Sequence, residues 1–129
     1  MRFGMSDGHR EDAGRRNYLA GQAAEDVVSR HYLSLGVTLV EHRWRGKAGE
    51  IDLIFRDGDA LVFVEVKKSH SFDAAAARLL PTQVRRLRTA AEEFAGREPA
   101  GLLTEMRFDV ALVDGQGDVH ILENALWEM

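Results

Sequence analysis

Two mostly apolar runs, 50–56 and 61–67, lie on either side of a short polar segment. That segment is Asp57-Gly58-Asp59, and both runs are rich in apolar, β-branched residues. Glycine-containing dipeptides supply the positive φ that a tight hairpin turn needs, so the pattern predicts an antiparallel hairpin. The second run is apolar on both faces from 61 to 64, as expected of a strand in the middle of a sheet.

The polar positions of this hairpin fall on one face if its loop has an even length. Glu50 and Asp52 share one face of the first strand, and Glu65 and Lys67 share one face of the second, because side chains alternate along a strand. A two-residue loop at Gly58-Asp59 sets Asp52 opposite Glu65, and a loop one residue earlier slides the pairing but keeps all four on one side. A three-residue loop without a bulge would separate them. We expect the even loop because it also gathers apolar residues on the other face: Ile51, Leu53 and Phe55.

The carboxylates at this end of the hairpin need a partner. Acidic groups that lie together repel one another and lose hydration, so they require a cation, a proton or a basic side chain. A divalent metal ion with Lys67 beside it would meet that need. The alternative is a solvated hairpin face with a Glu–Lys pair across it.

The N-terminal part of the chain predicts a leader and a helix. Residues 1–14 are polar and glycine-dotted without periodicity, so we expect a disordered leader there and a single domain over residues 15–129. From about Asn17 to Leu35, apolar residues recur at spacings of three and four, which predicts a helix that ends at Gly36. Glu25 lies at the edge of the apolar stripe. It is either a surface glutamate or a further acidic group that reaches the polar face of the hairpin.

The remaining pattern predicts an α/β fold. Residues 37–44 form a strand ahead of the hairpin, and a basic connection with two glycines follows over 45–49. A polar loop over residues 68–73 precedes a helix that begins near Pro81 and ends at Gly96. Two further strands are expected over 106–113 and 119–122. The predicted order is one helix, three strands, one helix and one strand, with a short closing strand.

Composition narrows the possible functions. The chain has 129 residues, 45% of them hydrophobic, with no cysteine and a formal net charge of −4. The lack of cysteine removes disulfides, thiol catalysis and cysteine-ligated zinc, and it suits a reducing cytosol. No apolar stretch reaches 18 residues and no signal-peptide region is evident, so we expect a cytoplasmic protein that is neither secreted nor inserted in a membrane. The negative net charge argues against nonspecific nucleic-acid binding over the whole surface, but it is compatible with a local basic strip that binds nucleic acid.

Two basic regions are candidates for phosphate contacts. Arg43, Arg45 and Lys47 cluster just ahead of the acidic positions of the hairpin. Between residues 73 and 92 there is no acidic residue, and this segment contains Arg78, Arg85, Arg86 and Arg88. Such a local excess of positive charge could neutralise several phosphates despite the acidic total. The alternative is a solvated loop and a solvated helix face.

The order of elements and the acidic motif resemble the PD-(D/E)XK, restriction-endonuclease-like superfamily. Asp52 matches the aspartate of its motif, and Glu65-Val66-Lys67 matches its E-x-K. Four blocks, spread between residues 17 and 127, are more specifically similar to the YraN family of small bacterial, predicted endonuclease-like proteins. These blocks are Gly21-x-x-Ala24-Glu25, Gly49-Glu50-Ile51-Asp52-Leu53-Ile54, Val62-Phe63-Val64-Glu65-Val66-Lys67 and Arg107-Phe108-Asp109-Val110.

The resemblance implies a fold, a reaction and a cofactor. The fold would be a restriction-endonuclease-like αβββαβ core in which helices flank a mixed sheet. Asp52, Glu65 and the Val66 carbonyl would hold Mg²⁺ or Mn²⁺, with Glu25 or Glu50 assisting directly or through water. Lys67 would orient the attacking water and offset charge in the transition state.

The implied function is metal-dependent hydrolysis of phosphodiester bonds in nucleic acid, with DNA expected over RNA. One such site cuts one strand, so cleavage of both strands of a duplex requires two encounters or a homodimer. The rival hypothesis is a non-catalytic nucleic-acid-binding or adaptor module with a nuclease-like fold.

Two departures from the family pattern affect the expected phosphate contacts. The family commonly follows E-V-K with a threonine or similar residue and an arginine, where this chain has Lys68-Ser69. It often has K-Q at the start of the last helix, where this chain has Thr82-Gln83. Lys68 and Gln83 therefore join the candidate nucleic-acid contacts, and Arg85 and Arg86 are the residues that could replace the missing lysine.

Overall fold

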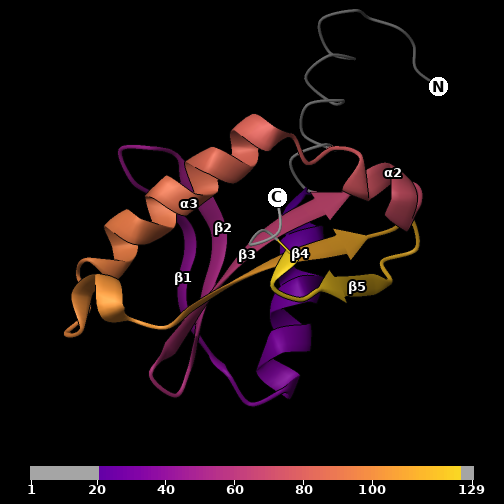
Figure 1. The fold of residues 1–129 in the computed structure, drawn as a ribbon. Coiled ribbons are helices and arrows are strands. Elements are labelled where there is room, and N and C mark those ends of the chain that lie inside the picture. The colour runs from indigo at the N-terminus through magenta and orange to yellow at the C-terminus, as the bar shows by residue number, and fades with distance from the viewer. Residues whose placement is uncertain (1–20, 126–129) are drawn as a thin grey trace, which may run out of the picture.

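The computed structural model describes residues 21–125, and its centre is a five-stranded mixed sheet (Figure 1). The strands lie side by side in chain order: β1 (Thr38–Arg45), β2 (Glu50–Asp57), β3 (Ala60–Lys68), β4 (Met106–Val113) and β5 (Val119–Leu122). β3 and β4 run parallel, and the other neighbours run antiparallel. A parallel neighbour requires a crossover, which here contains α2 (Phe72–Ala76), α3 (Pro81–Ala95) and the single turn η1 (Gly101–Leu103).

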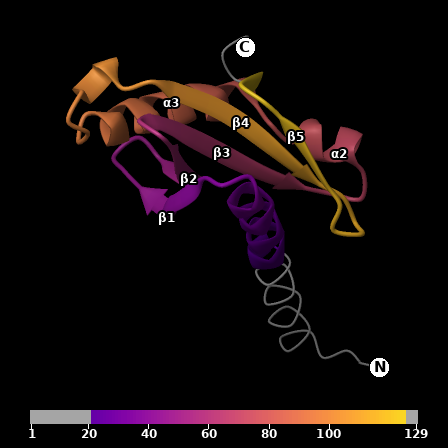
Figure 2. The same ribbon diagram turned by 90° about the horizontal axis from the view of Figure 1, so that it is seen from below.

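Helices cover both faces of the sheet. Figure 2 shows α2 and α3 on one side of the sheet and the N-terminal helix on the other. That helix is described over residues 21–34, within the range that the apolar spacing predicts. The α/β class with a mixed sheet flanked by helices is confirmed. The predicted leader and both ends of the predicted domain lie outside the described residues.

The β2–β3 hairpin has the predicted even loop. Asp57 pairs with Ala60, so the loop consists of Gly58 and Asp59. Gly58 has φ 62°, the left-handed region that glycine enters most easily and that a type II′ turn requires at its first central position. The Asp57-Gly58-Asp59 sequence therefore fixes the register of the two strands that carry the acidic motif.

The expected polar loop over residues 68–73 is shorter than predicted, because α2 begins at Phe72. The Ser71 hydroxyl accepts a hydrogen bond from the Ala74 N–H at 3.1 Å and thereby caps the first turn. No helix of the described residues is both long enough and apolar enough to cross a membrane.

The buried side chains form one cluster on each face of the sheet. The cluster under the N-terminal helix consists of Ala24, Val28, Tyr32, Leu53, Phe55, Val62, Val64, Ala111 and Val113. The cluster under the other helices combines buried residues of the sheet, such as Phe63 and Phe108, with Ala75 of α2 and Leu87 and Phe94 of α3. The sheet is thus buried on both sides at β3, as its apolar sequence predicts.

The prediction for Ile51 is wrong. Ile51 was expected to share a face with Leu53 and Phe55, but it packs with Ile54 in the cluster on the α3 side. Before Leu53, over residues 50–52, β2 does not pair with β3 and is paired only with β1, Ile51 with Trp44 and Glu50 with Arg45. The strand is therefore free to twist, and the simple alternation of faces breaks there.

Asp109 is a buried polar centre that ties the N-terminal helix to the sheet. Its fully buried carboxylate accepts hydrogen bonds from the Tyr32 hydroxyl at 2.6 Å and from Arg107 Nε and Nη2, both at 3.0 Å. The Asn124 N–H donates to the same carboxylate at 2.8 Å. Burial and this carboxylate raise the pKa of Tyr32, so the hydroxyl stays protonated and remains a donor. Asp109 is thus structural, and it also holds a basic group.

We expect Asp109→Ala to lower the free energy of unfolding by about 2 kcal/mol or more, because it leaves Tyr32 and a partly buried Arg107 without their acceptor. Urea unfolding followed by circular dichroism measures this loss. Asp26→Ala, at an exposed position on the N-terminal helix, is the matched control and should change little. Equal unfolding midpoints for the two variants would contradict the structural role of Asp109.

Candidate functional site

The site forms where β2 and β3 separate. Their antiparallel pairing ends at Leu53 and Val64, although β2 begins three residues earlier and β3 continues four residues further. In this split the Val66 N–H donates to Asp52 Oδ2 at 2.8 Å, whereas a continued ladder would pair it with the backbone of Ile51. The Asp52 side chain therefore ends the ladder and holds the two strands apart.

Asp52 and Glu65 interact across the split. The pKa of Asp52 is raised to about 8, mainly by burial and then by the negative charge of Glu65 and a hydrogen bond between the two carboxyl groups. The Val66 N–H lowers the pKa, and the charge of Glu25 adds to the increase. At neutral pH this pair therefore retains a proton unless a cation replaces it.

Lys67 completes the group on β3. Its Nζ lies 3.2 Å from Glu65 Oε2, and both side chains are mostly buried. Glu65 and Lys67 lie two residues apart on one face of the strand, so the ion pair follows from the strand period. The structure thus brings together the three residues for which the sequence predicts catalysis: Asp52, Glu65 and Lys67.

Glu25 reaches the site from the N-terminal helix, but it has its own partners. It is 8% exposed, and its Oε1 lies 2.7 Å from His42 Nε2 and accepts a hydrogen bond from Arg43 Nε at 3.0 Å. Arg43 has φ 54°, which is uncommon for a residue other than glycine, and the pairing of β1 with β2 skips it between His42 and Trp44. Arg43, a predicted nucleic-acid contact, therefore binds Glu25 within the protein.

Two hollows meet at Glu65. The larger, which we call the main cleft, has a volume of about 580 Å³, and its lining includes Glu25, Asp52, Glu65, Val66, Lys67, Lys68 and Arg78. The smaller, the side hollow, has a volume of about 230 Å³, and its lining includes Glu50, Glu65, Gln83 and Arg86. Glu50 and Glu25 therefore lie in different hollows and do not act as equivalent neighbours of the acid pair.

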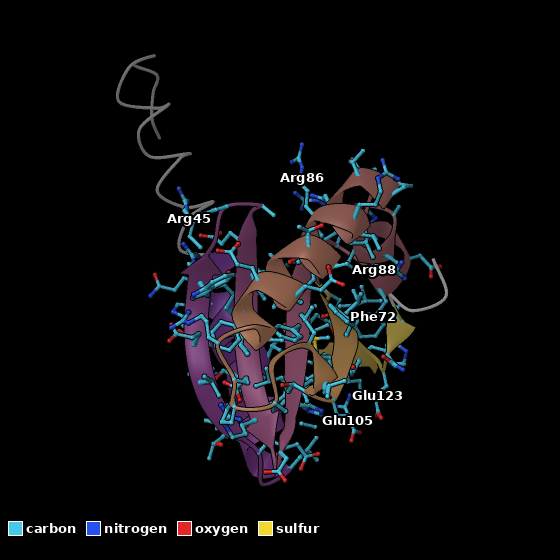
Figure 3. All side chains as sticks on the ribbon, turned by 60° about the vertical axis from the view of Figure 1, so that its left-hand side comes forward. Arg45, Phe72, Arg86, Arg88, Glu105 and Glu123 are labelled. Carbon is cyan, nitrogen blue, oxygen red and sulfur yellow. The ribbon has the colours of Figure 1, made fainter. Side chains whose placement is uncertain are left out.

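Of the other predicted nucleic-acid contacts, Gln83 and Arg86 line the side hollow and Lys68 lines the main cleft. The Arg45 side chain is 80% exposed, and its Nη2 lies 3.6 Å from Glu50 Oε2. Lys47 is exposed on the β1–β2 connection. Figure 3 shows Arg45 and Arg86 at the same end of the molecule, with Glu105 and Glu123 toward the other end. Arg85 is exposed on α3. The Gln83 side-chain oxygen accepts a hydrogen bond from the Leu80 N–H at 3.0 Å, so it also caps that helix.

The sequence from residue 24 to residue 113 matches the family model described as "Uncharacterised protein family UPF0102". The chain belongs to the UPF0102 family. This is the YraN family that its motifs resemble. A UPF0102 protein of Roseobacter denitrificans is 58% identical over 119 residues, 92% of each chain. Another, of Ruegeria pomeroyi, is 59% identical over 112 residues, 87% of this chain and 91% of its own. A third, of Cereibacter sphaeroides, is 54% identical over 113 residues, 88% of this chain and 97% of its own.

Sequence reasoning missed two contacts of the UPF0102 site. It grouped Arg78 with the basic segment but did not place it in the site, whereas Arg78 lines the main cleft and its Nη1 donates to the Lys68 carbonyl at 2.8 Å. It gave His42 no role, whereas His42 holds Glu25. The only available signals were the local excess of arginine and the position of His42 next to Arg43. Neither signal specifies a partner that lies many residues away in the chain.

The donor set of the UPF0102 site suits a hydrated hard cation. Among residues 21–125, no three histidine, cysteine, aspartate or glutamate side chains are grouped closely enough to hold a metal ion alone. Mg²⁺ commonly binds through only one or two carboxylates and keeps several waters. Asp52 and Glu65 are two carboxyl groups that lie close enough to interact. In a regular ladder the N–H and carbonyl of one residue face the same neighbour, so the Val66 carbonyl belongs to the split between β2 and β3.

Proposed function

We propose that this UPF0102 protein is a metal-dependent nuclease that hydrolyses phosphodiester bonds in nucleic acid, with DNA preferred over RNA. The observation that carries the proposal is the Asp52–Glu65 carboxyl pair, which lies in a cleft beside Lys67 and retains a proton in the absence of a cation. Two carboxylates kept together against their repulsion are costly unless they bind something. The resemblance to the PD-(D/E)XK superfamily, with its αβββαβ core, supports the same assignment.

Each residue of the site has a defined task in this proposal. Asp52, Glu65 and the Val66 carbonyl would hold Mg²⁺ or Mn²⁺, which when bound polarises a phosphodiester oxygen and acidifies a water. Asp52 gives up its proton when the ion binds. Lys67 donates hydrogen bonds to the attacking water and stabilises the negative charge that develops on the phosphate oxygens.

The exposed basic residues around the site would position the nucleic-acid backbone. Arg45 is the last residue of β1, Lys47 lies on the β1–β2 connection, and Arg86 lines the side hollow from α3. Phosphate contacts from such residues supply affinity that depends on salt and not on sequence. One site cuts one strand, so cleavage of both strands of a duplex would require two encounters or a homodimer.

The test is a nuclease panel on the purified protein. We expect Mn²⁺ or Mg²⁺ to raise the melting temperature and to permit cleavage of at least one of single-stranded DNA, duplex DNA, branched DNA and RNA. EDTA should abolish both effects, and addition of Mn²⁺ in excess should restore them. Binding of nucleic acid without cleavage at any metal concentration would refute the nuclease and favour the adaptor module.

A further inference from the structure

The main cleft has a basic end that the proposed reaction does not use. Lys68, the last residue of β3, and Arg78, from the connection between α2 and α3, both line this cleft. Within residues 21–125, neither cation forms an ion pair with a carboxylate, whereas Lys67 is paired with Glu65. Two positive charges that no carboxylate of the described residues neutralises therefore lie in one cleft with the acid pair.

The Arg78 guanidinium is held at the end of β3 that carries Lys68. The Arg78 Nη1 donates to the Lys68 carbonyl at 2.8 Å, which ties the guanidinium to the end of β3. Arginine has five N–H donors, so most of them remain for a ligand, in the planar fork that matches a phosphate. A tethered arginine also loses less side-chain entropy when it binds than a free one does.

The spacing along β3 relates this basic end to the acid pair. Lys68 lies three residues beyond Glu65, which corresponds to about 10 Å at the usual rise of a strand. An anion in the cleft is attracted to Lys68 and Arg78, whereas at the other end the positive charge of Lys67 is already paired with Glu65. The electrostatic potential in the cleft therefore becomes more positive along β3 from Glu65 toward Lys68.

We propose that Lys68 and Arg78 form a second phosphate subsite, which binds the phosphate group that neighbours the scissile one on the same nucleic-acid strand. The identity of the ligand rests on the proposed nuclease function. The subsite needs no metal ion, because its own charges face the anion. It fixes which side of the scissile bond enters the main cleft and so orients the strand over the acid pair.

Binding in EDTA tests the subsite without any cleavage. The probes are single-stranded DNA 12-mers, each with one uncharged methylphosphonate linkage, moved along the strand from one oligonucleotide to the next. Wild-type protein should bind most of them alike and lose affinity roughly tenfold when the neutral linkage falls at the subsite. Arg78→Ala should bind every probe with that reduced affinity and show no further loss at that linkage.

The matched control is Arg30→Ala, which removes the same charge from an exposed position on the N-terminal helix and should reproduce the wild-type profile. Lys68→Ala should lose sensitivity at the same linkage as Arg78→Ala. The slope of log Kd against log salt should fall by about 0.7 for Arg78→Ala, as expected for one lost contact to a single strand. Circular dichroism melts establish that each variant is folded.

The outcomes separate this inference from the nuclease proposal. If Arg78→Ala still loses affinity at the same neutral linkage as the wild type, as Arg30→Ala should, the subsite proposal is wrong even if the protein cuts DNA. Failure of the wild-type protein to bind the unmodified 12-mer in EDTA would also overturn the subsite. The expected profile without any metal-dependent cleavage would retain the subsite and refute the nuclease.

Discussion

Glu65→Gln should reduce metal-dependent cleavage by about a thousandfold while the protein remains folded. The substitution keeps the size of the side chain and an oxygen that can accept a hydrogen bond from Lys67, which now lies 3.2 Å from the carboxylate. It removes one of the two charged oxygen ligands proposed for the cation, and loss of metal-based charge stabilisation costs several kcal/mol in the transition state. A tenfold change in rate corresponds to about 1.4 kcal/mol, so the expected loss spans about three such steps.

Single-turnover cleavage with Mn²⁺ in excess measures this loss, because saturating metal separates a weaker affinity from a slower reaction. Glu105→Gln provides the matched control: Glu105 is exposed and lies toward the other end of the molecule in Figure 3. Its rate should equal that of the wild type. A Glu65→Gln rate within threefold of that control would remove Glu65 from the reaction and would leave the acid pair with only a structural role.

Local rules predicted the part of the site that a short segment determines. The turn at Gly58 set the register of β2 and β3, and the period of two placed Glu65 and Lys67 on one face. Both features depend on neighbours within about ten residues. The sequence alone therefore predicts that Asp52, Glu65 and Lys67 lie together.

The rest depends on contacts between distant segments. Where β2 separates from β3, the Val66 N–H donates to the Asp52 side chain and Ile51 packs on the other face, neither of which a period of two predicts. The sequence does not decide whether Glu25 lies at the surface or in the site, because its burial depends on how the N-terminal helix packs on the sheet. The bond between Arg78 and Lys68 likewise requires the α2–α3 connection to return to the end of β3.

Asp52 makes the stability of the metal-free protein depend on pH. The sign of the slope of stability against pH distinguishes a metal site from a stabilising ion pair. The raised pKa means that the folded protein holds a proton between about pH 4 and about pH 8 that the unfolded chain has released. Stability then decreases as pH rises through this window, by up to about 1.4 kcal/mol per pH unit, because the folded state binds more protons. An ion pair that lowers the pKa of an aspartate would have the opposite slope.

Asp52→Asn should therefore be more stable than the wild type in EDTA at pH 8 and above, and this advantage should disappear toward pH 4. The asparagine oxygen can still accept the hydrogen bond from the Val66 N–H, so the variant removes the charge and keeps the contact. Urea unfolding at pH 5, 6.5 and 8 measures the difference, with Asp26→Asn as the exposed control. Mg²⁺ should then raise the stability of the wild type and leave that of Asp52→Asn unchanged. If Asp52→Asn is less stable at every pH, the carboxylate contributes to folding and the cation is not what keeps the acid pair together.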